Sequence, residues 1–411
     1  MSDRAVAHVT CLGCGCACDD ITVVVQRDRI VEARNACVLG TTWFGDGTVP
    51  ADIRVNGRSA SFEQALAEAA KALKSAKRPF VYLAGDISCE TQRVAVAVAD
   101  RLHAAIDSLA ATAAESVLAA QRRGRAGATL GEIREQADLI AFWGVDPDVR
   151  YPRYMSRYAP GAVAGRTLIA VDVGERRGPA AAAERVTIAP ADEVDALGAM
   201  RAAVQARVAG DDVRFRAAVE LARRMAKSRY VAIVADAEPG APAAPAPDPA
   251  RAEALVTLAQ ALNGPTRCAL STLRGGGNRS GADAVLTWQT GFPFAVDFAP
   301  GYPTYRPRGG GDAAALLAAG EPDAALVIGA PATVPDAVAA GLVRVRSIAI
   351  GPRASAASFR PAVAVDTGTA GIHEEGTALR MDDVPLPLRP SLNGARTALD
   401  AVGALLARLA S

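Results

Sequence analysis

The stretch SFEQALAEAAKALKSAKRPFVYLA, residues 61–84, decides the fold class. Ser61 followed by Gln64 is a capping-box pattern, so we predict a helix over residues 62–77. The apolar run at residues 80–84 has the length of a buried strand. A helix followed at once by a buried strand is the repeating unit of α/β proteins.

The same unit recurs along the chain, with alanine-rich helical stretches between short apolar runs. Continuous apolar strands separated by helices indicate parallel sheets that are covered on both faces. We therefore predict an α/β fold with parallel sheets flanked by helices. The further predicted strands lie at 139–142, 168–171, 186–188, 231–234, 268–270, 325–328, 347–350 and 363–365.

A Pro/Ala-rich segment and a cluster of cysteines suggest how the chain is divided. Alternating apolar residues at 21–25 and 29–33 predict a small antiparallel hairpin near the cysteines. The predicted regions are an N-terminal Cys-bearing cap at 1–60, a first α/β region at 61–237, a Pro/Ala-rich loop at 238–250, and a second α/β region at 251–411 with a C-terminal strand and helix.

Composition excludes several classes of function. The 411 residues include 45 Lys and Arg against 44 Asp and Glu, so no broad basic surface for nucleic acid is expected. The sequence has no run of about 20 apolar residues and no signal-like N-terminus, so we expect a cytoplasmic protein without a membrane segment.

Four of the seven cysteines lie within CLGCGCAC, residues 11–18. Cys11, Cys14, Cys18 and the later Cys37 give four thiols spaced C-x2-C-x3-C-x18-C, a set that suits a 4Fe–4S cluster. Tetrahedral zinc accepts the same ligands. A third alternative is a glycine-rich turn with reduced thiols and no metal. Disulfides are not expected, because cytoplasmic thiols stay reduced.

Other cysteine and charged residues are explained by burial, by surface exposure or by ion pairing. Cys89 and Cys268 adjoin apolar runs and are predicted to be buried fillers. The charged stretch His373–Gly376 is predicted to be a surface loop. Arg150, near Arg153 and Arg157, is placed at the end of a predicted strand, where it would bind either ligand phosphates or the carboxylates of a partner protein; we favour the partner.

Several motifs in order carry a family resemblance. With the cysteine cluster, they resemble successive segments of the molybdenum- or tungsten-binding B subunit of formylmethanofuran dehydrogenase. They span nearly the whole chain. The segments are FWGVDP at 142–147, YPRYMSRY at 151–158, RGGGN at 274–278, WQTGFPF at 288–294, VDF at 296–298, GYPTY at 301–305 and LRMD at 379–382.

The resemblance implies a reduced molybdopterin oxidoreductase fold, of the formate dehydrogenase and DMSO reductase type. It also implies a vestigial pterin groove formed by Gly275, Gly276, Asn278 and Arg153. Gly275 to Gly277 alone indicate either a phosphate-binding loop or a tight turn; we favour the turn.

The family ligates its metal through a cysteine, and the corresponding stretch, IDSLAATAAESV at 106–117, has none. Ala113 and Ala114 lie where the ligand would be. Oxygen ligands from Thr112, Glu115 or Ser116 are the alternative. A methyl group supplies neither charge nor a lone pair to a metal, so the Mo or W pterin is expected to be absent.

We therefore predict a non-redox structural subunit of a bacterial formyltransferase/hydrolase complex. The resemblance implies that such a complex converts formyl-tetrahydromethanopterin to formate through a methanofuran-like carrier, in the formaldehyde oxidation of methylotrophs. Its partners would be a zinc hydrolase subunit, a formyltransferase subunit and a C-type subunit. Two alternatives stay open: a redox-active Mo or W formylmethanofuran dehydrogenase subunit, and a 4Fe–4S electron-transfer subunit.

Overall fold

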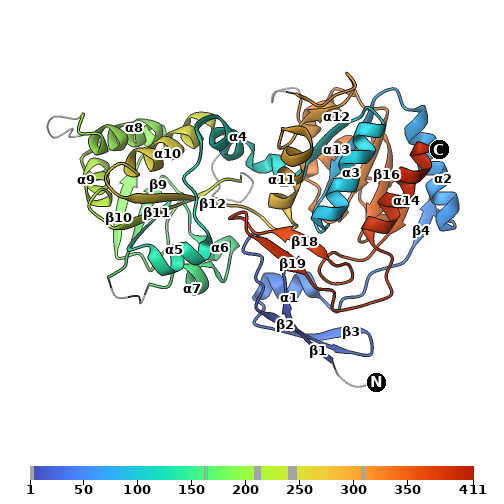
Figure 1. Ribbon diagram of the computed structural model, residues 1–411, viewed down its shortest axis with the longest axis horizontal. Helices are drawn as coiled ribbons and strands as arrows, with labels where there is room; N and C mark the ends of the chain where they lie inside the picture. Colours follow the sequence, from blue (N-terminus) through green and yellow to red (C-terminus); the bar gives the residue numbers. More distant parts are fainter. Residues whose placement is uncertain (1–3, 162, 164, 208–213, 239–247, 307–310) are drawn as a thin grey trace. The chain divides into compact units, whose positions relative to one another are not determined.

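The structure is a computed structural model that describes residues 4–161, 163, 165–207, 214–238, 248–306 and 311–411 (Figure 1). The chain forms two compact units: unit 1 comprises residues 1–111 and 275–411, and unit 2 comprises 112–274. Unit 2 is thus inserted into unit 1, which differs from the predicted division near 238–250. The reason is strand pairing across the insertion, because Phe80 pairs in parallel with Ala325. Most of the predicted Pro/Ala-rich loop, residues 239–247, lies outside the described residues.

Unit 1 is built on a nine-stranded sheet in the order β14-β13-β7-β6-β15-β16-β17-β4-β5. The five strands from β7 to β17 run parallel, and the two strands added at each edge join the sheet through antiparallel pairing. The strands are β4 Ile53–Val55, β5 Arg58–Ser59, β6 Pro79–Leu83, β7 Ala105–Ser108, β13 Val296–Asp297, β14 Thr304–Tyr305, β15 Ala324–Ile328, β16 Arg346–Gly351 and β17 Val363–Asp366.

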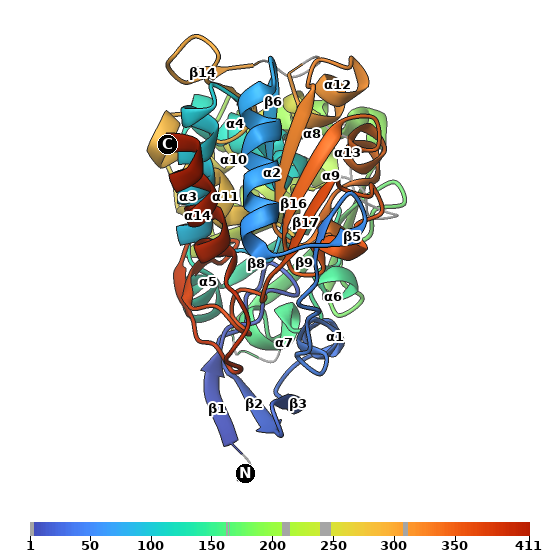
Figure 2. The same ribbon diagram turned by 90° about the vertical axis from the view of Figure 1, so that its right-hand side faces the viewer.

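Helices cover both faces of this sheet (Figure 2). Successive residues of a strand face opposite sides, so Leu326 and Ile328 pack in one hydrophobic cluster and Ala325 and Val327 in another. The first cluster includes α2 Phe62–Ser75, α3 Cys89–Arg101, α11 Arg279–Thr290 and α14 Ala398–Ala410. The second includes α12 Ala313–Ala318 and α13 Asp336–Leu342. Short 3-10 turns are η3 Pro331–Thr333 and η4 Ala354–Ala356.

The predicted start of α2 is confirmed. The Ser61 side chain accepts a hydrogen bond from the Gln64 amide, and the Gln64 side chain accepts one from the Ser61 amide. The helix ends at Ser75, two residues before the predicted end.

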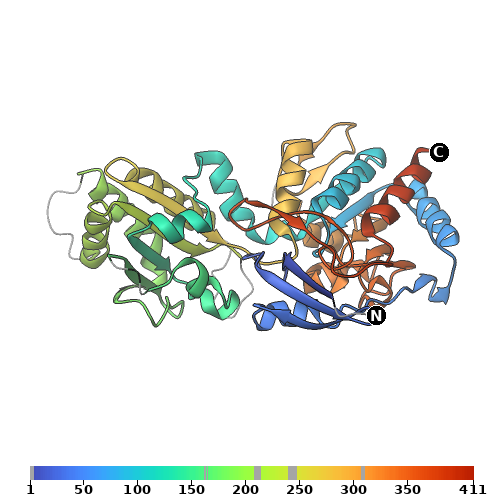
Figure 3. The same ribbon diagram turned by 60° about the horizontal axis from the view of Figure 1, so that its bottom comes forward.

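The N-terminal cysteines belong to a separate three-stranded antiparallel sheet of unit 1 (Figure 3). The predicted hairpin is confirmed as β2 Ile21–Gln26 and β3 Arg29–Arg34, and β1 Arg4–Val9 adds a strand that was not predicted. Helix α1 Val38–Phe44 follows, and the hairpin of β18 Gly376–Leu379 and β19 Pro385–Leu388 lies beside the cysteine loop. The predicted cap at 1–60 is too long, since β4 and β5 belong to the large sheet.

Unit 2 is a five-stranded, fully parallel sheet in the order β10-β9-β8-β11-β12 with its own hydrophobic core. The strands are β8 Leu139–Trp143, β9 Thr167–Val173, β10 Glu184–Ile188, β11 Tyr230–Asp236 and β12 Arg267–Leu273. The helices are α4 Ala114–Arg123, α5 Leu130–Gln136, α6 Pro147–Arg150, α7 Tyr154–Tyr158, α8 Glu193–Val204, α9 Arg216–Met225 and α10 Pro249–Leu262, with η2 Pro190–Asp192. The 3-10 turn η1, Leu109–Ala113, crosses the boundary between the units.

The α/β class is confirmed, with helices flanking a mixed sheet in unit 1 and a parallel sheet in unit 2. None of the described helices is long and apolar enough to cross a membrane.

Candidate functional site

The four predicted metal ligands belong to one short loop and the helix that follows the small sheet. The Cys11 amide donates to the Cys18 carbonyl at 2.9 Å and so closes the loop. Cys37 precedes α1 as its N-cap residue. A side chain placed at Gly40 of α1 would have its Cβ 3.3 Å from Cys11 Sγ and 4.0 Å from Cys37 Sγ. The fold therefore brings Cys37 to the cysteine loop although 18 residues separate it from Cys18 in the sequence.

Electrostatics also links the four thiols. Burial raises the pKa of Cys11 far above its ordinary value, and Cys14, Cys18 and Cys37 each raise it further. Cys11 is therefore a neutral thiol at pH 7, and a bound metal would have to displace its proton. The donor set, four thiols around a glycine-rich loop, fits a four-thiolate metal or cluster. In the described part of the chain, however, no three His, Cys, Asp or Glu side chains converge closely enough to hold a metal as they stand.

The predicted glycine-rich loop packs directly on the cysteine loop. A Cβ at Gly276 would lie 2.2 Å from the Leu12 carbonyl oxygen and 2.7 Å from the Cys14 nitrogen. The Gly277 amide donates to the same Leu12 carbonyl at 2.8 Å. These contacts require glycine at 276 without any ligand, since no side chain fits between the two backbones.

Asn278 has a similar structural explanation. Its backbone is left-handed, with φ of 61°, and its side chain is buried at the start of α11. Its Nδ2 donates to the Ile87 carbonyl at 2.9 Å, and its Oδ1 accepts from the Leu379 amide at 2.9 Å. Asn278 thereby ties three segments of unit 1 together. Arg153, the fourth residue of the predicted groove, belongs to unit 2, where it precedes α7.

An acid that was not predicted lies beside these loops. Asp86 follows β6 and is largely shielded from solvent, and its Oδ1 accepts from Trp43 Nε1 at 3.0 Å. Its amide donates to the Gly277 carbonyl at 3.0 Å. Burial raises its pKa to about 6, although the Trp43 hydrogen bond and Arg279 oppose this. The sequence feature that could have indicated this acid is the Gly-Asp pair directly after a buried strand.

Comparison with known proteins settles the family. No protein-family model matches the chain. Over 414 residues the chain is 31% identical to the B subunit of tungsten-containing formylmethanofuran dehydrogenase 2 of Methanocaldococcus jannaschii, with 94% of this chain and 93% of that protein covered. The chain belongs to the family of formylmethanofuran dehydrogenase B subunits. The protein of the same description from Methanococcus maripaludis is 29% identical over 412 residues, which cover 93% of each protein.

A solved structure shares the fold of this B-subunit family member with a TM-score of 0.73. It is the formyltransferase/hydrolase complex FhcABCD from Methylorubrum extorquens in complex with methylofuran; the match has 24% identity and covers 87% of this chain and 98% of that one. The family resemblance carried by the ordered motifs is thereby confirmed.

At the position where the resemblance places the metal ligand, this member of the family has no donor side chain. Ala113 closes η1 and Ala114 opens α4, and both are fully buried. Thr112, Glu115 and Ser116 are only half-buried. Two methyl groups thus fill the interior at this point.

Three further predictions concern single residues or short segments elsewhere in the chain. Cys89 and Cys268 are buried as predicted, and burial raises their pKa to about 11 and about 12. The predicted surface loop at His373–Gly376 holds for Glu375, which is exposed, and is wrong for Glu374. Glu374 is buried and accepts hydrogen bonds from Ser88, Thr91 and Ala398. These donors lie far away in the sequence, so charge alone gave no sign of burial.

The partner-binding interpretation of Arg150 stays a prediction, and its guanidinium group has partners within the chain. It pairs with Asp236 of its own chain at 2.6 Å and with Glu238 at 3.6 Å, and so needs no carboxylate from a partner.

Proposed function

We propose that this B-subunit relative is a structural, non-redox component of a formyltransferase/hydrolase complex. The complex would convert formyl-tetrahydromethanopterin to formate through a methanofuran-like carrier. Formyl transfer and zinc-dependent hydrolysis would belong to other subunits, and this chain would hold them in place. The fold shared with the FhcABCD complex and the family membership support this assignment.

The observation that carries the proposal is the buried Ala113–Ala114 pair. A Mo or W centre that is ligated by the protein needs a donor atom at this position, and a methyl group cannot coordinate a metal. Both alanines are fully buried, so their methyl groups are not exposed to solvent. The chain would keep the framework of a reduced molybdopterin oxidoreductase fold and lack its metal chemistry. Gly275, Gly276, Asn278 and Arg153 would then be remnants of the groove, which the structural roles of Gly276 and Asn278 favour.

Elemental analysis of the purified native complex for Mo, W, Fe and Zn tests the proposal. We expect less than about one tenth of an equivalent of Mo and W per copy of this chain, with no extractable pterin, since no donor is present. One equivalent of either metal with bound pterin would overturn it. A matched variant, Ala113→Cys, should not by itself change formate production.

A 4Fe–4S electron-transfer protein is a second candidate, favoured by the electrostatic effect of Cys14, Cys18 and Cys37 on the Cys11 thiol. If bound, such a cluster would supply one-electron transfer, and these residues would hold it. The test is a broad visible absorbance that bleaches on reduction, together with about four Fe per chain. Loss of both signals in Cys14→Ser, but not in Cys268→Ser, would assign the cluster to this loop.

A further inference from the structure

In the sheet of unit 2, the order in which the chain adds strands reverses next to β8. The chain begins this sheet at β8, continues outward through β9 and β10 on one side, and then returns to place β11 and β12 on the other side. The carboxyl ends of β8 and β11 therefore form a topological switch point, where open parallel sheets ordinarily bind nucleotides or other ligands. Trp143 ends β8 and Asp236 ends β11.

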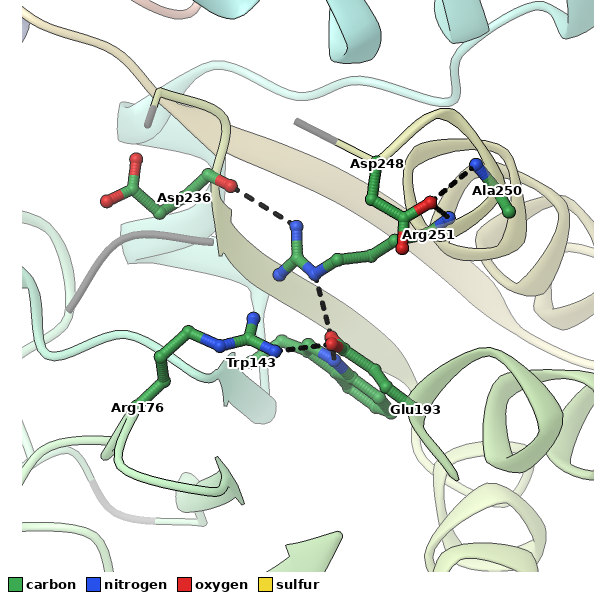
Figure 4. A network of polar contacts seen from close by, with 7 residues as sticks. All are labelled: Trp143, Arg176, Glu193, Asp236, Asp248, Ala250 and Arg251. Carbon is green, nitrogen blue, oxygen red and sulfur yellow. Dashed lines mark hydrogen bonds and ion pairs between the residues drawn. The ribbon is translucent and has the colours of Figure 1, made fainter. Parts of the chain in front are cut away.

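A buried carboxylate of the chain itself occupies this position (Figure 4). Glu193, the first residue of α8, accepts from Trp143 Nε1 at 2.8 Å and from Arg251 Nε at 2.7 Å. Arg176, from the loop after β9, donates to its other oxygen. Burial alone would raise the pKa of Glu193, but Arg251 and Arg176 lower it below its usual value, so the carboxylate is ionised.

A second group of charges adjoins the first. Arg251 also donates to the Asp236 carbonyl, and the Asp236 carboxylate pairs with Arg150. Glu238 pairs with Arg150 in turn, and its side chain is 1% exposed. The network at the strand ends thus contains three arginines and three carboxylates, and its net charge is zero.

Two donors of this network have no hydrogen-bond partner among the described residues. They are Arg176 Nη1 and Arg251 Nη2, and both atoms are buried. Figure 4 shows the two guanidinium groups reaching Glu193 from different sides. Buried guanidinium N–H groups without a partner are costly, and they match the oxygens of a phosphate or carboxylate.

We infer that Glu193 fills, as part of the chain, the place that a ligand phosphate takes at the switch point of such a sheet. The wild-type unit 2 is thereby closed to nucleotides, and removal of this one negative charge turns Arg176 and Arg251 into an anion site. The inference deepens the proposed function and rests on it, because it gives a physical reason why unit 2 of this chain would hold no dinucleotide.

The test is titration of the full chain with inorganic phosphate and with ADP, for wild type, Glu193→Gln and Glu253→Gln. A glutamine in place of Glu193 keeps the shape and the acceptor oxygen and loses the charge. We expect E193Q to bind ADP at least about tenfold more tightly than wild type, a change of about 1.4 kcal/mol. E253Q is the matched control, since Glu253 also pairs with two arginines, Arg122 and Arg123, but on the surface. It should behave as wild type.

Wild-type binding of ADP that is lost in Arg251→Met would overturn the inference, as would an unchanged affinity in E193Q. Should E193Q fail to fold by circular dichroism, Glu193→Ala is titrated in its place, since it removes the same negative charge, and the same two outcomes apply. Failure of the proposed function is distinguishable, since it appears as Mo or W in the native complex whatever the variants bind.

Discussion

At the residue scale, His373 has one defined tautomer. Its Nδ1 accepts from the Thr369 amide at 3.1 Å, so its Nε2 carries the proton and donates to the Gly47 carbonyl at 2.8 Å. If the ring took up a second proton, Nδ1–H and the Thr369 N–H would face each other as two hydrogen-bond donors. The ring also lines a cavity of about 420 Å³ together with Asp366 and Arg396.

This arrangement predicts a pH-dependent stability. Burial lowers the pKa of His373 below its ordinary 6.5, so the unfolded chain takes up the proton first. The contribution of His373 to stability is full above pH 6.5 and falls at lower pH, by at most about 1.4 kcal/mol per pH unit. Urea unfolding from pH 5 to 8 should show the advantage of wild type over His373→Gln shrinking below pH 6.5.

The stability that Asp86 contributes should depend on pH in the opposite direction. Its folded pKa of about 6 lies above the ordinary 3.8, so its protonated form favours the folded state. Relative to Asp86→Asn, wild type should lose up to about 3 kcal/mol of stability as the pH rises from about 4 to about 7. Asn suits the left-handed backbone at this position, where φ is 65°. Parallel stability curves for the two proteins between these pH values would contradict the prediction.

At the scale of elements, close backbone contact holds the cysteine loop in place. Gly276→Ala would push a methyl group into the Leu12 carbonyl, so we expect a loss of about 2 kcal/mol or more in the free energy of unfolding. A Cβ at Gly403 of α14 meets nothing within 4 Å, so Gly403→Ala should be neutral or stabilising by about 0.5–1 kcal/mol. Thermal unfolding of both variants checks this, and equal effects would refute the account of position 276.

The elements themselves were largely predictable. Apolar runs such as 325–328 correctly predicted the buried strands, and Ser61 correctly predicted the start of a helix. Both patterns are local in the sequence. The burial of Glu374 was not predictable, since its donors Ser88 and Thr91 precede it by more than 280 residues. The pairing of Arg150 with Asp236 also depends on tertiary contact.

At the scale of the whole molecule, the two units have separate hydrophobic cores. The sequence did not reveal the insertion, because nothing local in it says that β6 pairs with β15, which follows it by more than 240 residues.

Separate cores predict two unfolding transitions. Leu258→Ala in unit 2 and Leu326→Ala in unit 1 each remove a fully buried side chain, at a cost of about 2–5 kcal/mol. In differential scanning calorimetry each variant should lower the temperature of a different transition. A single transition that both variants shift equally would show that the units unfold together.

The strand order of unit 1 also bears on aggregation. A sheet of nine strands could offer two long rows of unpaired backbone groups to other molecules, which is the usual route to edge-to-edge association. Here the outermost strands, β14 Thr304–Tyr305 and β5 Arg58–Ser59, are two residues long, and β5 begins with an exposed arginine. The large sheet thus ends at both borders in a strand too short to template another chain.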